Sequence, residues 1–200
     1  MGSSSKTGLK CLVTGGAGFV GQVLASQILS DSSVSQLILT DVSKPPVPKD
    51  AEADQRLKRF PADLTNLSTI QSIFESSIDC IYLLHGIMSS QAESNFDLGL
   101  NVNIDSIRLI FDHLRATNPG VKVVFTSSTA VYGPPSDTSL ALSESVAPDP
   151  QSSYGAQKHV IETLLNDYSR RSLVDGRIVR LPTVSFYSER TLRWISDGHR

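Results

Sequence analysis

A glycine-rich turn between an apolar segment and a helix-like segment constrains the fold of this chain more than any other feature. The apolar segment Leu9–Thr14 has the length of a buried strand, and the turn that follows it carries Gly15, Gly18 and Gly21. Gly15 permits a tight exit from the strand, and Gly21 permits close packing of a helix on a sheet. The spacing therefore predicts a strand–turn–helix unit whose helix begins directly after the turn.

The same turn has the properties of a phosphate-binding site. Gly18 lets the backbone approach a pyrophosphate without a Cβ in the way, and Phe19 and Val20 begin the helix. The first N–H groups of a helix lack intrahelical partners and carry a partial charge of about +0.5, which favours an anion. We expect this segment to bind the pyrophosphate of a dinucleotide.

An aspartate at the end of the second apolar segment points to the kind of dinucleotide. Asp41 follows the glycines by about twenty residues, where an acid accepts hydrogen bonds from the adenosine ribose hydroxyls. A carboxylate at this place repels a 2′-phosphate, so NAD is favoured over NADP. Two observations leave room for another interpretation, because Asp41 can also be a turn residue and Lys44 lies close enough to weaken the preference.

Apolar segments alternate with helix-length segments along the rest of the chain. Further strands are predicted at 36–41, 57–61, 79–84, 121–127 and 177–181, and helices at 18–29, 66–75, 93–117 and 153–171. Strands that are apolar throughout and separated by helices indicate an α/β fold, a Rossmann-like doubly wound parallel sheet covered on both faces. Ligands of such sheets bind at the carboxyl ends of the strands. We expect one domain over 9–185, a flexible N-terminus over 1–8 and a separate tail over 186–200.

Composition limits the classes of partner. The net charge is −2 with 19% charged residues, so no overall field favours nucleic acid. No segment approaches the roughly twenty apolar residues needed to cross a membrane, and residues 1–6 lack the apolar core of a secretion signal. Cys11 and Cys80 are expected to be free thiols in a reducing compartment. We expect a soluble, cytoplasmic protein with a small-molecule substrate and no metal site.

A tyrosine and a lysine four residues apart are the first candidates for catalysis. Tyr154 and Lys158 share one face of the helix predicted over 153–171. A free tyrosine has a pKa near 10, and a nearby ammonium group favours the phenolate. A fall of that pKa by ~2–3 would correspond to about 3–4 kcal/mol of differential interaction. Lys158 can also donate a hydrogen bond to a nicotinamide ribose. The Y-x-x-x-K pattern alone occurs by chance in many helices.

Hydroxyl residues at the end of the preceding strand strengthen this interpretation. The sequence T-S-S-T-A-V-Y-G at 126–133 resembles the S-S-x-x-V-Y-G motif of extended short-chain dehydrogenases. By its position relative to Tyr132, Ser128 matches the catalytic serine of that family, and Ser127 is the rival. The glycine motif, Asp41, this serine motif and Y-x-x-x-K follow one another in the family's order, so the chain resembles the NAD-dependent epimerase/dehydratase family over roughly 9–185.

The resemblance implies roles for further residues. Asp63 and Leu64 resemble the family's adenine contact, Asn103 the helix asparagine that steadies the site, and 182–184 the segment that meets the carboxamide of the nicotinamide. The last of these comprises Pro182, Thr183 and Val184. Leu84, His85 and Gly86 follow the fourth strand beside the cofactor, and the substrate wall implied by the resemblance consists of Ser89, Ser90, Ser128 and Tyr154.

Two positions depart from the family pattern. The family has small residues after the fourth strand, whereas this chain has His85, whose imidazole could crowd the pyrophosphate or the nicotinamide ribose. It could also be an acid or base facing the substrate, or be merely tolerated. Ser106 stands where glycine is common.

Three stretches resemble one branch of the family, the D-erythronate dehydrogenases and related sugar-acid-oxidising enzymes. They lie at 90–99, 151–155 and 165–171. The family usually continues well beyond this length with the part that closes over the substrate, and 186–200 does not resemble that continuation, so we expect a C-terminally shortened member.

The resemblance implies an NAD-dependent oxidoreductase that acts on a hydroxyl of a small polyhydroxy, sugar-acid-like substrate. The alternatives are a sugar-nucleotide epimerase or dehydratase with bound NAD, and a shortened member repurposed as a cofactor-independent isomerase or cyclase or as a non-catalytic binding protein.

The resemblance also implies a homodimer through the helices 93–117 and 153–171. The apolar positions proposed for the dimer surface are Ile107, Phe111, Ile161 and Leu165. Some of these must instead pack on the sheet, because a helix of this length needs one buried face.

Overall fold

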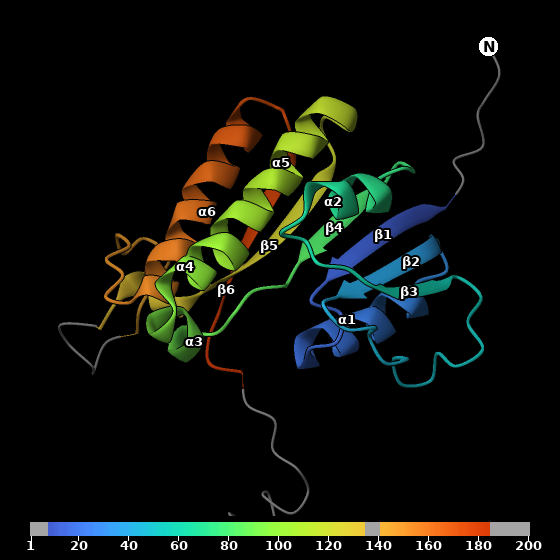
Figure 1. Cartoon of the computed structure of the whole chain (residues 1–200), viewed down its shortest axis with the longest axis horizontal. Coiled ribbons are helices and arrows are strands. Elements are labelled where there is room, and N and C mark those ends of the chain that lie inside the picture. Colours follow the sequence, from blue (N-terminus) through green and yellow to red (C-terminus); the bar gives the residue numbers. More distant parts are fainter. Residues whose placement is uncertain (1–7, 135–140, 185–200) are drawn as a thin grey trace, which may run out of the picture.

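The described part of the chain is a twisted parallel sheet between layers of helices (Figure 1). The computed structural model describes residues 8–134 and 141–184. All neighbouring strands are parallel, in the order β3-β2-β1-β4-β5-β6. The strands are β1 Leu9–Thr14, β2 Val34–Asp41, β3 Leu57–Pro61, β4 Cys80–Leu83, β5 Lys122–Ser128 and β6 Asp175–Leu181. The predicted Rossmann-like fold is confirmed.

Helices cover the two faces of the sheet unequally. α1 (Phe19–Ser30) packs on one face, whereas α2 (Leu67–Ile73), α5 (Ser106–Thr117) and α6 (Ser153–Arg170) pack on the other (Figure 1). Successive residues of a strand point to opposite faces, so β1 supplies Leu12 to the larger core under α5 and α6 and Val13 to the smaller core under α1. Both residues are fully buried, which explains why the strands are apolar throughout.

The prediction of one continuous helix over 93–117 was wrong. The segment holds α3 (Ser89–Ser94), α4 (Phe96–Leu100), the π-helix η1 (Asn101–Asp105) and α5. Asn95 interrupts the first two because its backbone is extended, with φ of −141°, and its side chain accepts a hydrogen bond from the N–H of Leu98. Asparagine is a favoured N-cap, so it ends one helix and begins the next.

The apolar residues proposed for the dimer surface lie in the core instead. Ile107, Phe111, Ile161 and Leu165 are all 0% exposed and pack between α5, α6 and the sheet. Each helix packs its apolar face against the sheet, as an amphipathic helix of this length must. The outward face of these helices is therefore made of other residues.

Two smaller expectations can be compared with the described residues. Cys11 and Cys80 are free thiols on the neighbouring strands β1 and β4, as predicted. Within 8–134 and 141–184, none of the helices is both long enough and apolar enough to span a lipid bilayer. The predicted N-terminal segment (except Gly8) and the tail over 186–200 lie outside the described residues.

Candidate cofactor and catalytic site

A cavity of about 690 Å³ opens at the carboxyl ends of the strands, where ligands of this fold bind. Its walls come from the turn before α1, the loop after β4, the end of β5, the start of α6 and the segment after β6. The lining residues are Gly15, Gly18, Phe19, Val20, Gly21, Leu84, Gly86, Ile87, Met88, Ser89, Thr126, Ser127, Ser128, Thr129, Ala130, Tyr154, Lys158, Leu181, Pro182, Thr183 and Val184.

The glycine turn forms one end of this cavity. Gly15 has φ of +70°, and a Cβ at this position would stand 2.7 Å from the backbone nitrogen of His85, so a larger residue is excluded. At Gly18 a Cβ would meet only the carbonyl oxygen of Gly15, at 3.3 Å, which leaves this side of the turn open. The turn therefore presents backbone to the cavity, as a phosphate cradle requires.

The residues expected on the adenosine side do not line the cavity. Asp41 braces the glycine turn, because its carboxylate accepts hydrogen bonds from the N–H groups of Ala17 at 3.0 Å and Val42 at 2.8 Å. Asp63 accepts three hydrogen bonds from Thr65 and Asn66, and those from Thr65 in particular lower its pKa. The Leu64 side chain, at 5% exposure, belongs to the core. These residues shape the edge of the sheet beside the cavity.

The three predicted catalytic residues line the other end of the cavity. Lys158 is 4% exposed, and its ammonium group donates a hydrogen bond to the carbonyl oxygen of Thr126 at 2.9 Å. The Nζ atom lies 5.6 Å from the ring centroid of Tyr154 and 4.8 Å from that of Phe125. Burial among these groups lowers the pKa of Lys158 to about 8, because the ammonium loses its hydration.

The expected lowering of the tyrosine pKa is absent from this form of the site. Burial raises the pKa of the Tyr154 phenol above its ordinary value, since an anion is disfavoured away from water. The ammonium group of Lys158, whose Nζ atom lies 5.6 Å from the centroid of the Tyr154 ring, does not offset this cost. Tyr154 is therefore protonated at neutral pH here, and a phenolate requires further positive charge in the cavity.

Ser128 is arranged as a hydrogen-bond donor. Its Oγ atom accepts a hydrogen bond from the N–H of Ala130 at 3.1 Å, as the N-cap of the short 3₁₀ helix η2 (Thr129–Tyr132). One lone pair is thereby used, and the hydroxyl hydrogen remains available to a substrate oxygen. Ser127 is 3% exposed and, by the alternation of the strand, points to the face that carries α6. The geometry favours Ser128 over its neighbour.

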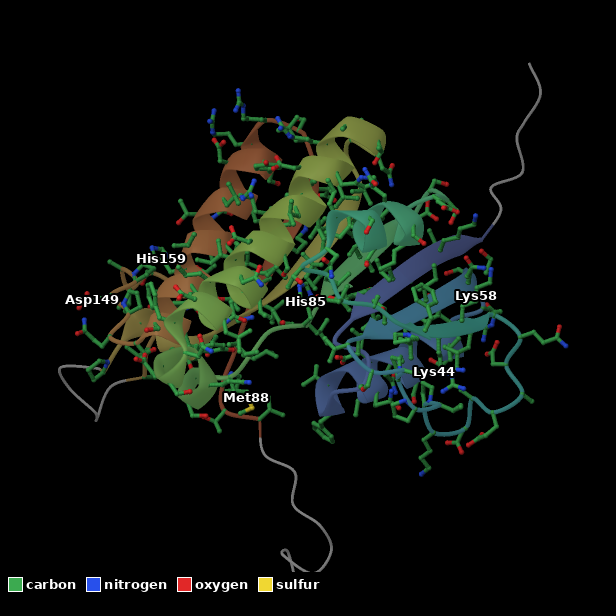
Figure 2. All side chains as sticks on the ribbon, viewed as in Figure 1. Lys44, Lys58, His85, Met88, Asp149 and His159 are labelled. Carbon is green, nitrogen blue, oxygen red and sulfur yellow. The ribbon has the colours of Figure 1, made fainter. Side chains whose placement is uncertain are left out.

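The side chain of His85 is not part of the cavity wall. Its ring lies between the end of β1 and the start of α5 (Figure 2), with Nδ1 at 2.7 Å from Oγ1 of Thr14 and Nε2 at 2.9 Å from Oγ of Ser106. Both hydroxyl residues are buried. The ring turns away from the cavity to these two partners. Of the alternatives left open by the sequence, this placement favours an imidazole that is merely tolerated beside the cavity over one that faces the substrate.

The hydrogen-bond chain fixes the tautomer of this imidazole. The Ser106 hydroxyl donates to the carbonyl oxygen of Val102 at 2.7 Å, so it can only accept from His85. The ring hydrogen must then be on Nε2, and Nδ1 accepts from the hydroxyl of Thr14. The two residues that depart from the family pattern, His85 and Ser106, are thus hydrogen-bonded to each other. Together with Thr14 they connect the end of β1 to the start of α5.

The chain matches the NAD dependent epimerase/dehydratase family over residues 11–192. It belongs to this family. Among the curated relatives, the D-erythronate dehydrogenases of Haemophilus influenzae and Cupriavidus necator are 39% and 38% identical, and both alignments cover 88% of the chain. The chain spans 55% and 56% of the lengths of these two relatives.

Solved structures of the same fold agree. A nucleoside-diphosphate-sugar epimerase from Agrobacterium tumefaciens is 33% identical, with a TM-score of 0.83 over 94% of this chain and 57% of the other. The UDP-glucuronic acid 4-epimerase from Bacillus cereus, solved in complex with NAD, is 26% identical with a TM-score of 0.74 over 88% of this chain and 57% of the other. The resemblance inferred from the motifs is confirmed at the level of the family.

The structure of this family member adds cavity residues that the motifs did not indicate. Ile87 and Met88 lie in the loop between β4 and α3, and Met88, which lines the cavity, is 75% exposed (Figure 2). Of the two serines proposed for the substrate wall, Ser89 lines the cavity and Ser90 does not. Their position in the sequence could have identified these cavity residues, because residues just past the carboxyl end of a strand, here β4 or β5, face the ligand side of such a sheet.

We expect His85→Ala to destabilise the protein and to flatten its response to acid. The lost packing and the two unpaired hydroxyl groups cost about 2–3 kcal/mol in the free energy of unfolding. Burial, and secondarily Lys158, lower the pKa of His85 to about 3 from an ordinary 6.5. The unfolded chain then binds a proton that the folded chain refuses, so stability falls as the pH drops below 6.5 toward 3. Denaturant titrations across this range measure both effects.

The wild-type protein, measured over the same pH range, is the reference. If wild type and His85→Ala lose stability in parallel on acidification, the neutral, enclosed state of His85 is wrong.

Proposed function

We propose that this chain binds NAD in the cavity and supplies the catalytic residues of an oxidoreductase. The substrate we propose is a small polyhydroxy, sugar-acid-like compound, and the reaction interconverts one of its hydroxyl groups with a carbonyl. The observation that carries the proposal is that the glycine turn and the group Ser128, Tyr154 and Lys158 line a single cavity. The likeness to two D-erythronate dehydrogenases supports the substrate class.

The residues present fit an NAD molecule. The open side of the turn at Gly18 offers backbone to a pyrophosphate, and Phe19 and Val20 begin α1 at the same place. The carboxylate of Asp41, anchored beside the turn, disfavours the extra phosphate of NADP. At the other end, Lys158 and the segment 182–184 are placed to hold the ribose and carboxamide of the nicotinamide.

The chain's own residues would act as follows. Ser128 donates its free hydroxyl hydrogen to the substrate oxygen and holds it in place. As the phenolate, Tyr154 takes the proton of the substrate hydroxyl and becomes the neutral phenol. The ammonium of Lys158 favours the phenolate before this transfer, once further positive charge shares the cavity. NAD supplies the hydride acceptor for this oxidation.

Calorimetric titration with NAD and with NADP tests the first part of the proposal. We expect NAD to bind and NADP to bind more weakly, because the carboxylate of Asp41 repels the 2′-phosphate. A Gly18→Val variant should abolish binding, since its side chain occupies the open side of the turn while meeting only Gly15. The absence of any heat with millimolar NAD would contradict the proposal and favour a repurposed, cofactor-independent or non-catalytic member.

A sugar-nucleotide epimerase with tightly held NAD is the second candidate. The specific observation in its favour is the 33% identity to a nucleoside-diphosphate-sugar epimerase. The two reactions differ in the fate of the hydride, because a dehydrogenase releases NADH and an epimerase returns the hydride to its substrate. NADH appearance with a panel of sugar acids, set beside product analysis with sugar nucleotides, separates them. The free thiols of Cys11 and Cys80 support a reducing compartment, the cytoplasm, for either activity.

We also propose a homodimer through the outward faces of α5 and α6. Val160, on α6, is 47% exposed. The last residue of η1 and the helix α5 that follows it carry charges of alternating sign, at Asp105, Arg108, Asp112 and Arg115. A two-fold axis across the middle of α5 reverses its direction, so that each aspartate faces an arginine of the second copy. This self-complementary order supports an isologous contact.

Val160→Glu should convert the dimer into a monomer, because it places an unpaired charge in the centre of that contact. Light scattering coupled to size-exclusion chromatography measures the mass. Val23→Glu is the matched control, as Val23 is 51% exposed on α1, far from α5 and α6. A wild-type protein that is monomeric at high concentration would exclude the dimer.

A further inference from the structure

Two buried amide side chains lie between the catalytic helix α6 and the loop after β4. Asn103, in η1, is 1% exposed, and Gln157, in α6, is 2% exposed. The Oδ1 atom of Asn103 accepts a hydrogen bond from the N–H of Ile87 at 2.8 Å. Its Nδ2 group donates to the carbonyl oxygen of Ile87 at 3.2 Å and to Oε1 of Gln157 at 2.7 Å. Asn103 thus holds both backbone groups of one cavity residue.

Asn103 sets the orientation of the Gln157 amide, and this orientation leaves the buried Nε2 group of Gln157 without a partner among the described residues. Because Nδ2 of Asn103 is a donor, Gln157 must present its oxygen, and a flipped amide would place two donors against each other. The Nε2 group of Gln157 is then buried and has no hydrogen-bond partner within the described residues. A buried donor without a partner is unfavourable, and the hydrogen bond to Asn103 offsets part of the cost of burying this residue.

The amide pair packs closely against two glycines. A Cβ at Gly99, in α4, would stand 2.5 Å from Nε2 of Gln157. A Cβ at Gly86 would stand 2.8 Å from Oδ1 of Asn103. Side chains at these two positions would fill the space that the amides occupy, so the glycines enclose the pair from both sides.

Gln157 also connects the two walls of the cavity. It precedes Lys158 directly and follows Tyr154 by three residues, whereas Ile87 and its neighbours form the facing wall. We propose that Gln157 is a positioning residue: it orients the amide of Asn103, and through Asn103 it fixes the backbone at Ile87 and so the distance between the catalytic helix and the opposite wall. The proposal rests on the proposed function only in taking this cavity as the reaction site.

Hydrogen exchange at the Ile87 amide, measured by NMR without any ligand, tests the proposal. In Gln157→Met the volume is kept and the acceptor is lost, so the Asn103 amide is free to turn away from Ile87. We expect the Ile87 N–H to exchange about tenfold faster, the effect of losing one hydrogen bond, while amides of β1 keep their protection. In Asn103→Ala the same amide should exchange faster still, and adding Gln157→Met to that variant should change nothing more, since Gln157 acts through Asn103.

The control Gln71→Met makes the same chemical change on the exposed face of α2 and should leave Ile87 unaffected. Gln157→Glu keeps an acceptor for Asn103 and should retain the protection of Ile87, which provides a test even where the Met variant does not fold. Unchanged exchange in Gln157→Met, uniform acceleration of all amides, or loss of protection in Gln157→Glu would each overturn the proposal. Because NAD is absent from the experiment, its result is independent of whether the chain binds NAD.

Discussion

Tyr154→Phe is expected to lower the rate of NADH formation by about 10²–10⁴-fold, the usual contribution of a positioned proton acceptor. The substitution removes only the phenolic oxygen, so the ring still lines the cavity and NAD should bind with wild-type affinity. The residual rate then reports what Ser128 and the placement of the reactants achieve without Tyr154. The assay follows NADH absorbance with the sugar acid that gives the highest wild-type rate.

Tyr168→Phe is the matched control, because it makes the same change on the same helix. The hydroxyl of Tyr168 donates to Asp112 at 2.7 Å, away from the cavity, so this variant should lose about 1 kcal/mol of stability and no activity.

Burial raises the pKa of Tyr154, so oxidation by the wild-type protein should accelerate as the pH rises from neutral and the phenolate fraction grows. Full activity in Tyr154→Phe would refute the assigned mechanism.

The elements that define the fold were predictable because local pattern and tertiary structure agree in them. β3 was predicted with its observed bounds, and β6 only began two residues earlier, at Asp175. Apolar strands that end in glycine or in hydroxyl residues leave little choice of fold, because these segments must be buried on both faces and joined by helices. The same logic placed the glycine turn and Ser128 at one edge of the sheet.

The features that could not be predicted from the sequence depend on side chains that have more than one possible hydrogen-bond partner. Nothing local distinguishes an imidazole that faces a cofactor from one that turns back to Thr14 and Ser106, since the choice is made by hydroxyl groups far away in the chain. The break at Asn95 was missed for a similar reason, because asparagine is tolerated within helices and only its capping bond reveals the boundary. The pKa of Tyr154 was misjudged because spacing shows proximity of a charge but not burial.

The second large effect that we expect is a loss of stability when a buried ion pair next to the site is broken. The guanidinium group of Arg180, on β6, donates to both carboxylate oxygens of Glu162, on α6, at 2.8 and 2.6 Å, and to the hydroxyl of Tyr132 at 2.7 Å. The side chain of Glu162 is 3% exposed and that of Arg180 is 21% exposed. The pair joins the edge strand to the catalytic helix, one residue before the cavity segment that begins at Leu181.

Arg180→Met should lower the free energy of unfolding by about 3 kcal/mol at neutral pH, because it leaves the carboxylate of Glu162 buried without its guanidinium partner. Denaturant-induced unfolding measures the loss. Arg177→Met is the matched control on the same strand, since Arg177 pairs with Asp175 at side-chain exposures of 58% and 41%. An exposed pair contributes little, so this variant should lose less than about 1 kcal/mol.

The pH dependence separates the loss of the ion pair from the loss of packing. Burial alone would raise the pKa of Glu162, but the hydrogen bonds, with that from Arg180 foremost, outweigh it and hold the pKa below its ordinary 4.5. The stabilisation is therefore present above that pH and is lost as the pH falls through the folded-state value. In Arg180→Met the largest contribution that lowers this pKa is lost, and only the weaker ones of Ser127 and His159 still oppose burial. The carboxyl group therefore becomes neutral at higher pH, and the difference from wild type shrinks in acid. A difference that stays constant with pH would mean that Arg180 stabilises the strand by packing alone.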